Sequence, residues 1–175
     1  MSRLHCLFDT SAFLKHYNKK EEYANLVEEI FRHKRTVTIH FPNVCILEFR
    51  KNIHKAVTTE QTNRISPLVR NKVLKAFAYD IETYRIAIHN VTHRNIKMTA
   101  EIFKCAYNKR IGATGLSGID AVVVSSAYQI NRYAANFRLV TNDEDIKKVA
   151  SHYNIKVWYL RELKLSEIRK AIKEK

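Results

Sequence analysis

The chain has 175 residues, of which 46% are hydrophobic, so it is long enough for one globular domain with a single core. It carries 31 Lys and Arg against 17 Asp and Glu, a formal net charge of +14 that favours phosphate-rich partners such as nucleic acid. No run approaches the roughly 18 apolar residues of a membrane span. The basic residues are spread over many segments, which argues against a membrane-surface helix, so no membrane association is expected.

Short apolar segments rich in β-branched residues alternate with segments of helical periodicity. The expected strands are Leu4–Phe8, Thr36–Phe41, Arg85–Val91, Arg138–Thr141 and Lys156–Tyr159. The expected helices are Ser11–Tyr17, Glu21–His33, Val44–Val57, Leu68–Thr83, His93–Lys109, Ile119–Ile130, Asp143–His152 and Glu162–Lys173. Pro42 is expected to end the second strand and Asn43 to cap the following helix. This alternation predicts a three-layer α/β/α sandwich with a mainly parallel central sheet, in one domain spanning residues 1–175.

Two stretches stand out from the regular alternation. Residues 58–92 are the expected place for a helical embellishment of the domain. All three glycines of the chain fall between residues 111 and 119, directly ahead of Asp120. Glycine permits backbone conformations that other residues avoid, so we expect a mobile or tightly turning loop there.

The three cysteines, Cys6, Cys45 and Cys105, are an odd and widely spaced set without a CxxC pair. We therefore expect buried thiols in a reducing compartment, and neither disulfides nor zinc ligands. The N-terminal segment reaches Asp9 too soon for a secretory signal. Both features predict a cytoplasmic protein.

Four acidic residues are placed where they could work together. Asp9 and Asp143 each follow a predicted strand, Asp120 opens an apolar helix, and Glu48 lies on a helix face turned away from the buried stripe. Each has an ordinary explanation, as a helix cap for the three aspartates and as a Glu–Lys surface pair for Glu48. A parallel sheet could nevertheless bring the aspartates to one edge, where like charges call for a cation. A cluster of oxygen ligands alone suits Mg²⁺ or Mn²⁺ better than zinc.

The ordered set of these motifs resembles the acidic motifs of the PIN domain family, in particular the single-domain ribonucleases of the VapC toxin type. The motifs are Leu7-Phe8-Asp9-Thr10-Ser11, Leu47-Glu48, Gly118-Ile119-Asp120-Ala121 and Val140-Thr141-Asn142-Asp143. Each motif is short and weak alone, but the four in order are fairly specific and span nearly the whole chain.

The resemblance implies a divalent-metal-dependent endoribonuclease that hydrolyses RNA phosphodiester bonds. Its catalytic and metal-binding residues would be Asp9, Glu48, Asp120 and Asp143, with Mg²⁺ or Mn²⁺ as cofactor. Supporting groups would be the hydroxyls of Thr10 or Ser11, and Thr141, which hold carboxylates and water. Asp145 is either an additional ligand or compensation for the helix dipole. The expected partners are an RNA substrate, the antitoxin protein of a toxin–antitoxin pair, and a second copy of the chain in a homodimer.

Three lysines, Lys15, Lys51 and Lys55, are expected to contact RNA phosphates without reading sequence. Phe13 and Tyr17 either stack on bases or pack in the core or a dimer interface, and packing is the favoured interpretation.

The main alternative function is a catalytically inactive PIN-like module that binds nucleic acid or a protein. Other enzyme classes lack their signatures. Ser11 stands where a phosphotransferase of the haloacid dehalogenase kind needs a second acid, and the phosphate-binding G-x-x-x-x-G-K-[ST] pattern does not occur.

Overall fold

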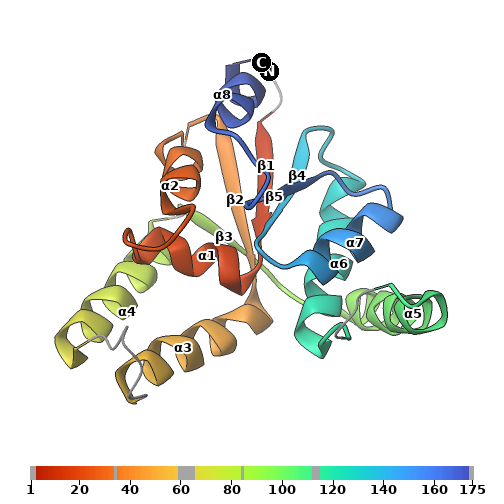
Figure 1. The fold of residues 1–175 in the computed structure, drawn as a ribbon, viewed down its shortest axis with the longest axis horizontal. Coiled ribbons are helices and arrows are strands. Elements are labelled where there is room, and N and C mark those ends of the chain that lie inside the picture. The colour runs from red at the N-terminus through yellow and green to blue at the C-terminus, as the bar shows by residue number, and fades with distance from the viewer. Residues whose placement is uncertain (1–2, 34, 59–65, 84, 112–114, 174–175) are drawn as a thin grey trace.

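A computed structural model describes residues 3–33, 35–58, 66–83, 85–111 and 115–173. Its centre is a five-stranded sheet in the order β3-β2-β1-β4-β5, in which every neighbouring pair is parallel (Figure 1). The strands are β1 (Leu4–Phe8), β2 (Val37–Pro42), β3 (Ile86–His89), β4 (Phe137–Thr141) and β5 (Val157–Tyr159).

Helices cover both faces of this sheet. They are α1 (Thr10–Tyr17), α2 (Ala24–Arg32), α3 (Asn43–Thr58), α4 (Pro67–Glu82), α5 (His93–Lys109), α6 (Gly118–Asn131), α7 (Glu144–His152) and α8 (Leu165–Lys173). The helices α1 to α4 lie on one side of the sheet and α5 to α7 on the other, while α8 returns to contact α2 (Figure 1). The predicted three-layer α/β/α sandwich with a parallel sheet is therefore confirmed.

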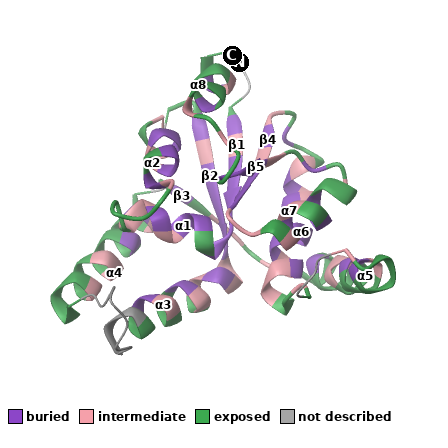
Figure 2. Ribbon diagram, in the orientation of Figure 1, coloured by how far each residue is buried: buried purple, intermediate pink, exposed green. Residues whose placement is uncertain are grey.

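The core between the sheet and α1, α3 and α4 is largely aromatic. Phe13 is fully buried and stacks on Phe41 with ring centroids 4.2 Å apart, while Phe49 and Phe77 approach it edge-on. Tyr17 packs against the same cluster and donates a hydrogen bond of 2.9 Å to a buried carboxylate. Figure 2 shows the same division through the molecule, with buried residues along the strands and the inward faces of the helices. Both Phe13 and Tyr17 thus serve packing, as favoured.

The second strand ends at Pro42, as predicted, whereas Asn43 is already the first residue of α3 and not the residue before it. The Asn43 side chain accepts a hydrogen bond of 3.3 Å from the N–H of Val91, so it ties α3 to the segment after β3. Within residues 58–92, β3 is a strand of the central sheet and Phe77 of α4 lies in the core, so this part belongs to the fold itself and is not an added arm. Residues 59–65 and 84 lie outside the described residues.

In the described ranges, no helix combines the length and the apolar character that crossing a membrane requires.

Candidate nuclease site

The order of the strands marks one edge of the sheet as the place for a ligand. The chain moves outward from β1 through β2 to β3, then returns to the other side of β1 to form β4 and β5. In open parallel sheets, ligands bind outside the carboxyl ends of the strands where the direction reverses, which here lies between β1 and β4. Asp9 directly follows β1, and Asp143 comes two residues after β4. Helices α3 and α6 both begin near this end and contact one another (Figure 1).

Asp9 is the most deeply buried of the four acids, with only 3% of its surface exposed. Its Oδ1 accepts the N–H of Ala12 at 2.6 Å as the cap of α1, and both its oxygens accept from the Ser11 hydroxyl at 3.0 Å. Its Oδ2 accepts from the hydroxyl of Thr141 at 2.5 Å. Burial raises the pKa of Asp9 to about 6; these hydrogen bonds oppose the rise, and the charge of Asp143 adds to it. A cation bound beside Asp9 would favour the ionised form of this buried carboxyl group.

Glu48 is hydrogen-bonded to Thr10, the residue that follows Asp9 in the chain. The hydroxyl of Thr10, at the start of α1, donates a hydrogen bond to Oε2 of Glu48 on α3. Thr10 is buried and Glu48 is half-buried, so this contact fixes the glutamate at the sheet edge. This is a different contact from the Glu–Lys surface pair considered as its ordinary explanation.

Asp120 forms the predicted capping box at the start of α6. Its N–H donates to the Ser117 hydroxyl at 3.2 Å, and the Ser117 N–H donates to Oδ2 of Asp120 at 3.0 Å. The ordinary explanation for Asp120 is therefore confirmed, and the cap also fixes where the carboxylate lies. Gly115 has a positive φ of 91°, the turn for which glycine is suited, whereas residues 112–114 of the predicted loop lie outside the described part of the chain.

Asp143 caps α7 and is connected to Asp9 through one side chain. Its Oδ1 accepts the N–H groups of Asp145 at 2.7 Å and Ile146 at 3.1 Å. Its own N–H donates to the hydroxyl of Thr141 at 2.9 Å, the same hydroxyl that donates to Asp9. Asp145 follows as a half-buried residue in the first turn of α7.

Three of the acids influence the pKa of Cys45. Cys45 lies on α3 and is fully buried, as expected of this thiol. Burial raises the pKa of Cys45 to about 12; a hydrogen bond with Thr10 opposes the rise, and the charges of Asp9, Glu48 and Asp120 add to it. All three charges therefore act on the same thiol, each with a smaller effect than its burial. The sequence pointed to Cys45 only as a core residue, although it lies one turn before Glu48 on the same helix.

The donors at this edge have the chemistry that a hard divalent cation prefers. They are carboxylate and hydroxyl oxygens, and the Cys45 thiol stays protonated at neutral pH because of its raised pKa. Within the described residues, no three His, Cys, Asp or Glu side chains are arranged as a ready-made metal site. The carboxylates instead accept bonds from helix N–H groups and hydroxyls, so the donor types fit Mg²⁺ or Mn²⁺ while the ligand geometry is not closed around an ion.

The model of the PIN domain family matches residues 6–151 of this sequence. The chain belongs to the PIN domain family. No curated protein matched it in a comparison of sequences.

Solved structures share the fold of this PIN domain at low sequence identity. One is VapBC2 from Rickettsia felis, solved bound to a DNA fragment from its promoter. It is 17% identical to this chain with a TM-score of 0.58, and the match covers 89% of this chain and 98% of that one. FitAcB from Neisseria gonorrhoeae is 13% identical with a TM-score of 0.59, over 90% and 99% of the two chains. PAE2754 from Pyrobaculum aerophilum is 14% identical with a TM-score of 0.56, over 95% and 90%.

The three lysines singled out in the sequence differ in their surroundings in this PIN domain. Lys51 and Lys55 are exposed on α3, the helix that carries Glu48. Lys15 is buried, with its ammonium 3.4 Å from Oε2 of Glu21 and 5.7 Å from the centre of the Tyr23 ring. Lys15 thus has a partner inside the molecule, and phosphate contact by any of the three stays a prediction.

Proposed function

We propose that this PIN domain is a divalent-metal-dependent endoribonuclease that hydrolyses RNA phosphodiester bonds. Asp9, Glu48, Asp120 and Asp143 would hold Mg²⁺ or Mn²⁺ and form the catalytic site. The observation that carries the proposal is a set of hydrogen bonds at the edge of the sheet where ligands bind: Thr141 bonds to both Asp9 and Asp143, and Thr10, next to Asp9, donates to Glu48. PIN domains are typically nucleases, and the basic charge of the chain suits a polyanionic substrate.

Residues around the carboxylates would divide the work of binding and orientation. A divalent ion, when bound, supplies charge for phosphate oxygens and acidifies water. The hydroxyls of Thr10, Ser11 and Thr141 hold two of the carboxylates in fixed orientations. One carboxylate would accept the proton of the attacking water. Lys51 and Lys55, exposed on α3, would contact phosphates of the RNA.

We further propose that the chain is the toxin of a toxin–antitoxin pair and acts in the cytoplasm, with a homodimer as its assembly. Its structural neighbours include VapBC from Salmonella typhimurium bound to DNA and FitAB bound to a DNA fragment, which supports an antitoxin partner. Co-expression with the neighbouring reading frame tests this proposal. The expected result is a stable complex that suppresses cleavage, and a neighbouring product that neither binds nor inhibits contradicts the toxin role.

Cleavage of a mixed RNA pool in the presence of Mn²⁺ tests the nuclease proposal. We expect Asp9→Asn and Asp120→Asn each to lower the cleavage rate by about 100-fold or more, the usual contribution of a positioned proton-transfer group. Glu167→Gln removes an exposed acid from α8 at the other end of the sheet and serves as the matched control, with activity like the wild type. Equal cleavage by all four proteins contradicts the assigned site.

The second candidate is a PIN domain that binds nucleic acid or protein without cutting. One observation favours it: Asp9 and Asp143 each cap a helix, Asp120 takes part in the capping box of α6, and the described residues hold no closed set of metal ligands. Calorimetric titration with Mn²⁺ separates the two functions. A nuclease binds the ion with a dissociation constant in roughly the micromolar range, within the span of oxygen-ligand sites, whereas an inactive module binds none there.

A further inference from the structure

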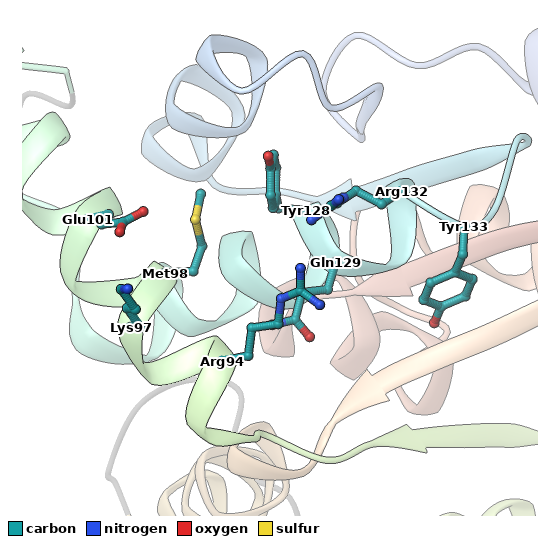
Figure 3. A pocket seen from close by; sticks show the side chains of 8 residues that line it. All are labelled: Arg94, Lys97, Met98, Glu101, Tyr128, Gln129, Arg132 and Tyr133. Atoms are coloured by element: carbon teal, nitrogen blue, oxygen red, sulfur yellow. The ribbon is translucent and has the colours of Figure 1, made fainter.

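A cavity of about 410 Å³ lies between α5 and α6, on the face of the sheet opposite α1 to α4 (Figure 3). Four of its lining side chains come from α5, and the others come from the last turn of α6 and the two residues after it (Figure 3). Those that carry the argument are three cations, two tyrosines and one amide: Arg94, Lys97, Arg132, Tyr128, Tyr133 and Gln129. The volume is within the range of small-ligand sites.

The charge of this cavity suits an anion. Arg94, Lys97 and Arg132 are exposed, and none of them forms an ion pair with a carboxylate among the described residues. Glu101 is the acid in the lining, so cations outnumber acids by three to one. Two guanidinium groups can each bind a phosphate with parallel hydrogen bonds.

The aromatic residues suit a base. Tyr133 is 66% exposed, a large amount for a tyrosine in a protein with a well-packed core, and Tyr128 forms a half-buried part of the wall. Exposed aromatic rings beside cations form the stacking surface on which single-stranded nucleic acids bind.

One buried donor in the lining lacks a partner. Nε2 of Gln129 is inaccessible to solvent and makes no hydrogen bond. A buried amide donor without an acceptor is unfavourable by about 1–3 kcal/mol, so native structures usually satisfy it with a protein group, an ordered water or a bound ligand. Gln129 lines the cavity, so a rotation of its side chain would bring this donor to an acceptor on a ligand, such as a base carbonyl or phosphate oxygen.

We propose that this cavity is a second RNA-binding site, which holds one nucleotide of a single-stranded substrate away from the carboxylates. Arg94, Lys97 and Arg132 bind phosphate, Tyr133 stacks on the base, and Gln129 donates a hydrogen bond to it. The proposal rests on RNA being the substrate of the proposed nuclease. Twelve residues separate Asp120 from Arg132 along α6, a distance of about 18 Å at 1.5 Å per residue, so the site binds a flanking part of the strand.

Binding of fluorescent single-stranded RNA of about 12 nucleotides, measured by anisotropy in EDTA, tests the site without any cleavage. We expect the double variant Arg94→Ala/Arg132→Ala to bind roughly tenfold more weakly. For this variant, the slope of log affinity against log salt concentration should be smaller in magnitude by about 1.4, because each phosphate contact to a single strand contributes about 0.7 to the slope. Lys164→Ala/Lys173→Ala removes the same charge from exposed positions in or beside α8 and is the matched control, with a smaller effect.

The stacking contact has its own matched pair of variants. Tyr133→Leu should weaken binding about fivefold or more, as expected for the loss of one stacked base. Tyr107→Leu changes an even more exposed tyrosine on α5, outside the cavity, and should leave affinity unchanged. Circular dichroism melts of all variants check folding, and the exposure of these side chains predicts unchanged melting temperatures.

Several outcomes overturn the proposal. Equal weakening by the cavity and α8 double variants means that only the overall charge matters. Unchanged RNA affinity together with lost binding of a poly-glutamate peptide by the cavity variants assigns the cavity to an acidic protein partner. The proposed nuclease function is tested separately: it is contradicted if Asp9→Asn and Asp120→Asn keep full cleavage. The cavity variants, in contrast, are expected to raise the KM for RNA and to leave kcat unchanged.

Discussion

The hydroxyl of Thr141 donates a hydrogen bond of 2.5 Å to Asp9 Oδ2, although the two residues are 132 positions apart in the sequence. The same hydroxyl accepts the N–H of Asp143 at 2.9 Å. One side chain at the end of β4 therefore sets the position of the acid after β1 relative to the acid that caps α7. This connection crosses the boundary between β1 and β4, where the proposed metal site lies.

Replacing Thr141 by valine should raise the pKa of Asp9 above its value of about 6, because the bond from this hydroxyl favours the ionised carboxylate. Titration of the Asp9 carboxyl by carbon NMR in the metal-free protein measures the shift. The variant should also unfold more easily by about 1.5–3 kcal/mol, the usual worth of a hydrogen bond to a charged group. Thr141→Ser keeps the hydroxyl and is the control; an unchanged Asp9 pKa in Thr141→Val contradicts the role of the bond.

Local sequence signals predicted the fold well, because each strand and helix carries its own pattern. The bounds expected for the first strand and for the helix at residues 93–109 agree with β1 and α5 to the residue. Helix caps can be predicted from equally local signals. Ser117 and Asp120 are three residues apart, and this spacing alone predicts their capping box.

Contacts between distant parts of the chain could not be predicted in the same way. The bond from Thr10 to Glu48 joins residues 38 apart, and the one from Val91 to Asn43 joins residues 48 apart. The sequence predicts a phosphate contact for Lys15, whereas α1 packs so that its ammonium lies 3.4 Å from Oε2 of Glu21. Such pairings depend on how helices pack on the sheet, which neither periodicity nor propensity specifies.

Asp9→Asn should stabilise the metal-free protein at pH 7. The pKa of Asp9 is about 6 in the fold against an ordinary value of 3.8, so the folded protein binds this proton more tightly than the unfolded chain. Stability is therefore lost as the pH rises from about 4 to 6, by about 3 kcal/mol in total. Asparagine carries no charge and avoids this loss.

Urea unfolding at two pH values measures the effect of Asp9→Asn. The gain should reach about 3 kcal/mol at pH 7 and vanish near pH 4, where the carboxyl is protonated in both states. A variant that is less stable than the wild type at pH 7 contradicts the raised pKa. Together with lost RNA cleavage, the gain would show that the charge at Asp9 is kept for function at the expense of stability.

Thr10→Val should reduce RNA cleavage about 10-fold to 100-fold, because Glu48 loses the hydroxyl that holds it beside Asp9. Thr10→Ser keeps the hydroxyl and should keep most of the activity. A double-mutant cycle with Glu48→Gln separates orientation of Glu48 from a general packing effect. If Thr10 acts through Glu48, the valine substitution adds little to Glu48→Gln, whereas simple additivity of the two effects contradicts this role.

His40 should make the fold sensitive to acid. It is buried on β2 with its Nε2 2.9 Å from Nδ1 of His5, and burial lowers its pKa to about 4, with the charges of His5 and His89 acting in the same direction. The unfolded chain therefore binds this proton more tightly, and stability is lost as the pH falls from about 6.5 to 4, by about 3 kcal/mol.

Unfolding should be followed in the Asp9→Asn background. In the wild type, protonation of Asp9 stabilises the fold as the pH falls over much of the same range, and this gain masks the loss from His40. His40→Phe keeps a ring beside His5 and should flatten the dependence on pH. An equally steep loss in His40→Phe assigns the acid sensitivity to other groups, of which the partly buried His16 has a lowered pKa as well.

Mn²⁺ should stabilise the protein without any substrate present. Binding to the folded state alone adds about 2.7 kcal/mol at an ion concentration 100 times the dissociation constant. The gain should disappear in Asp9→Asn and Asp120→Asn and persist in Glu167→Gln. A ligand must be ionised to bind the metal, so binding at pH 5 should release a proton from Asp9, whose pKa is about 6, and binding at pH 8 should release none from it. Calorimetry in two buffers of different ionisation enthalpy measures this release, and heats at pH 5 that are independent of the buffer exclude Asp9 as a ligand.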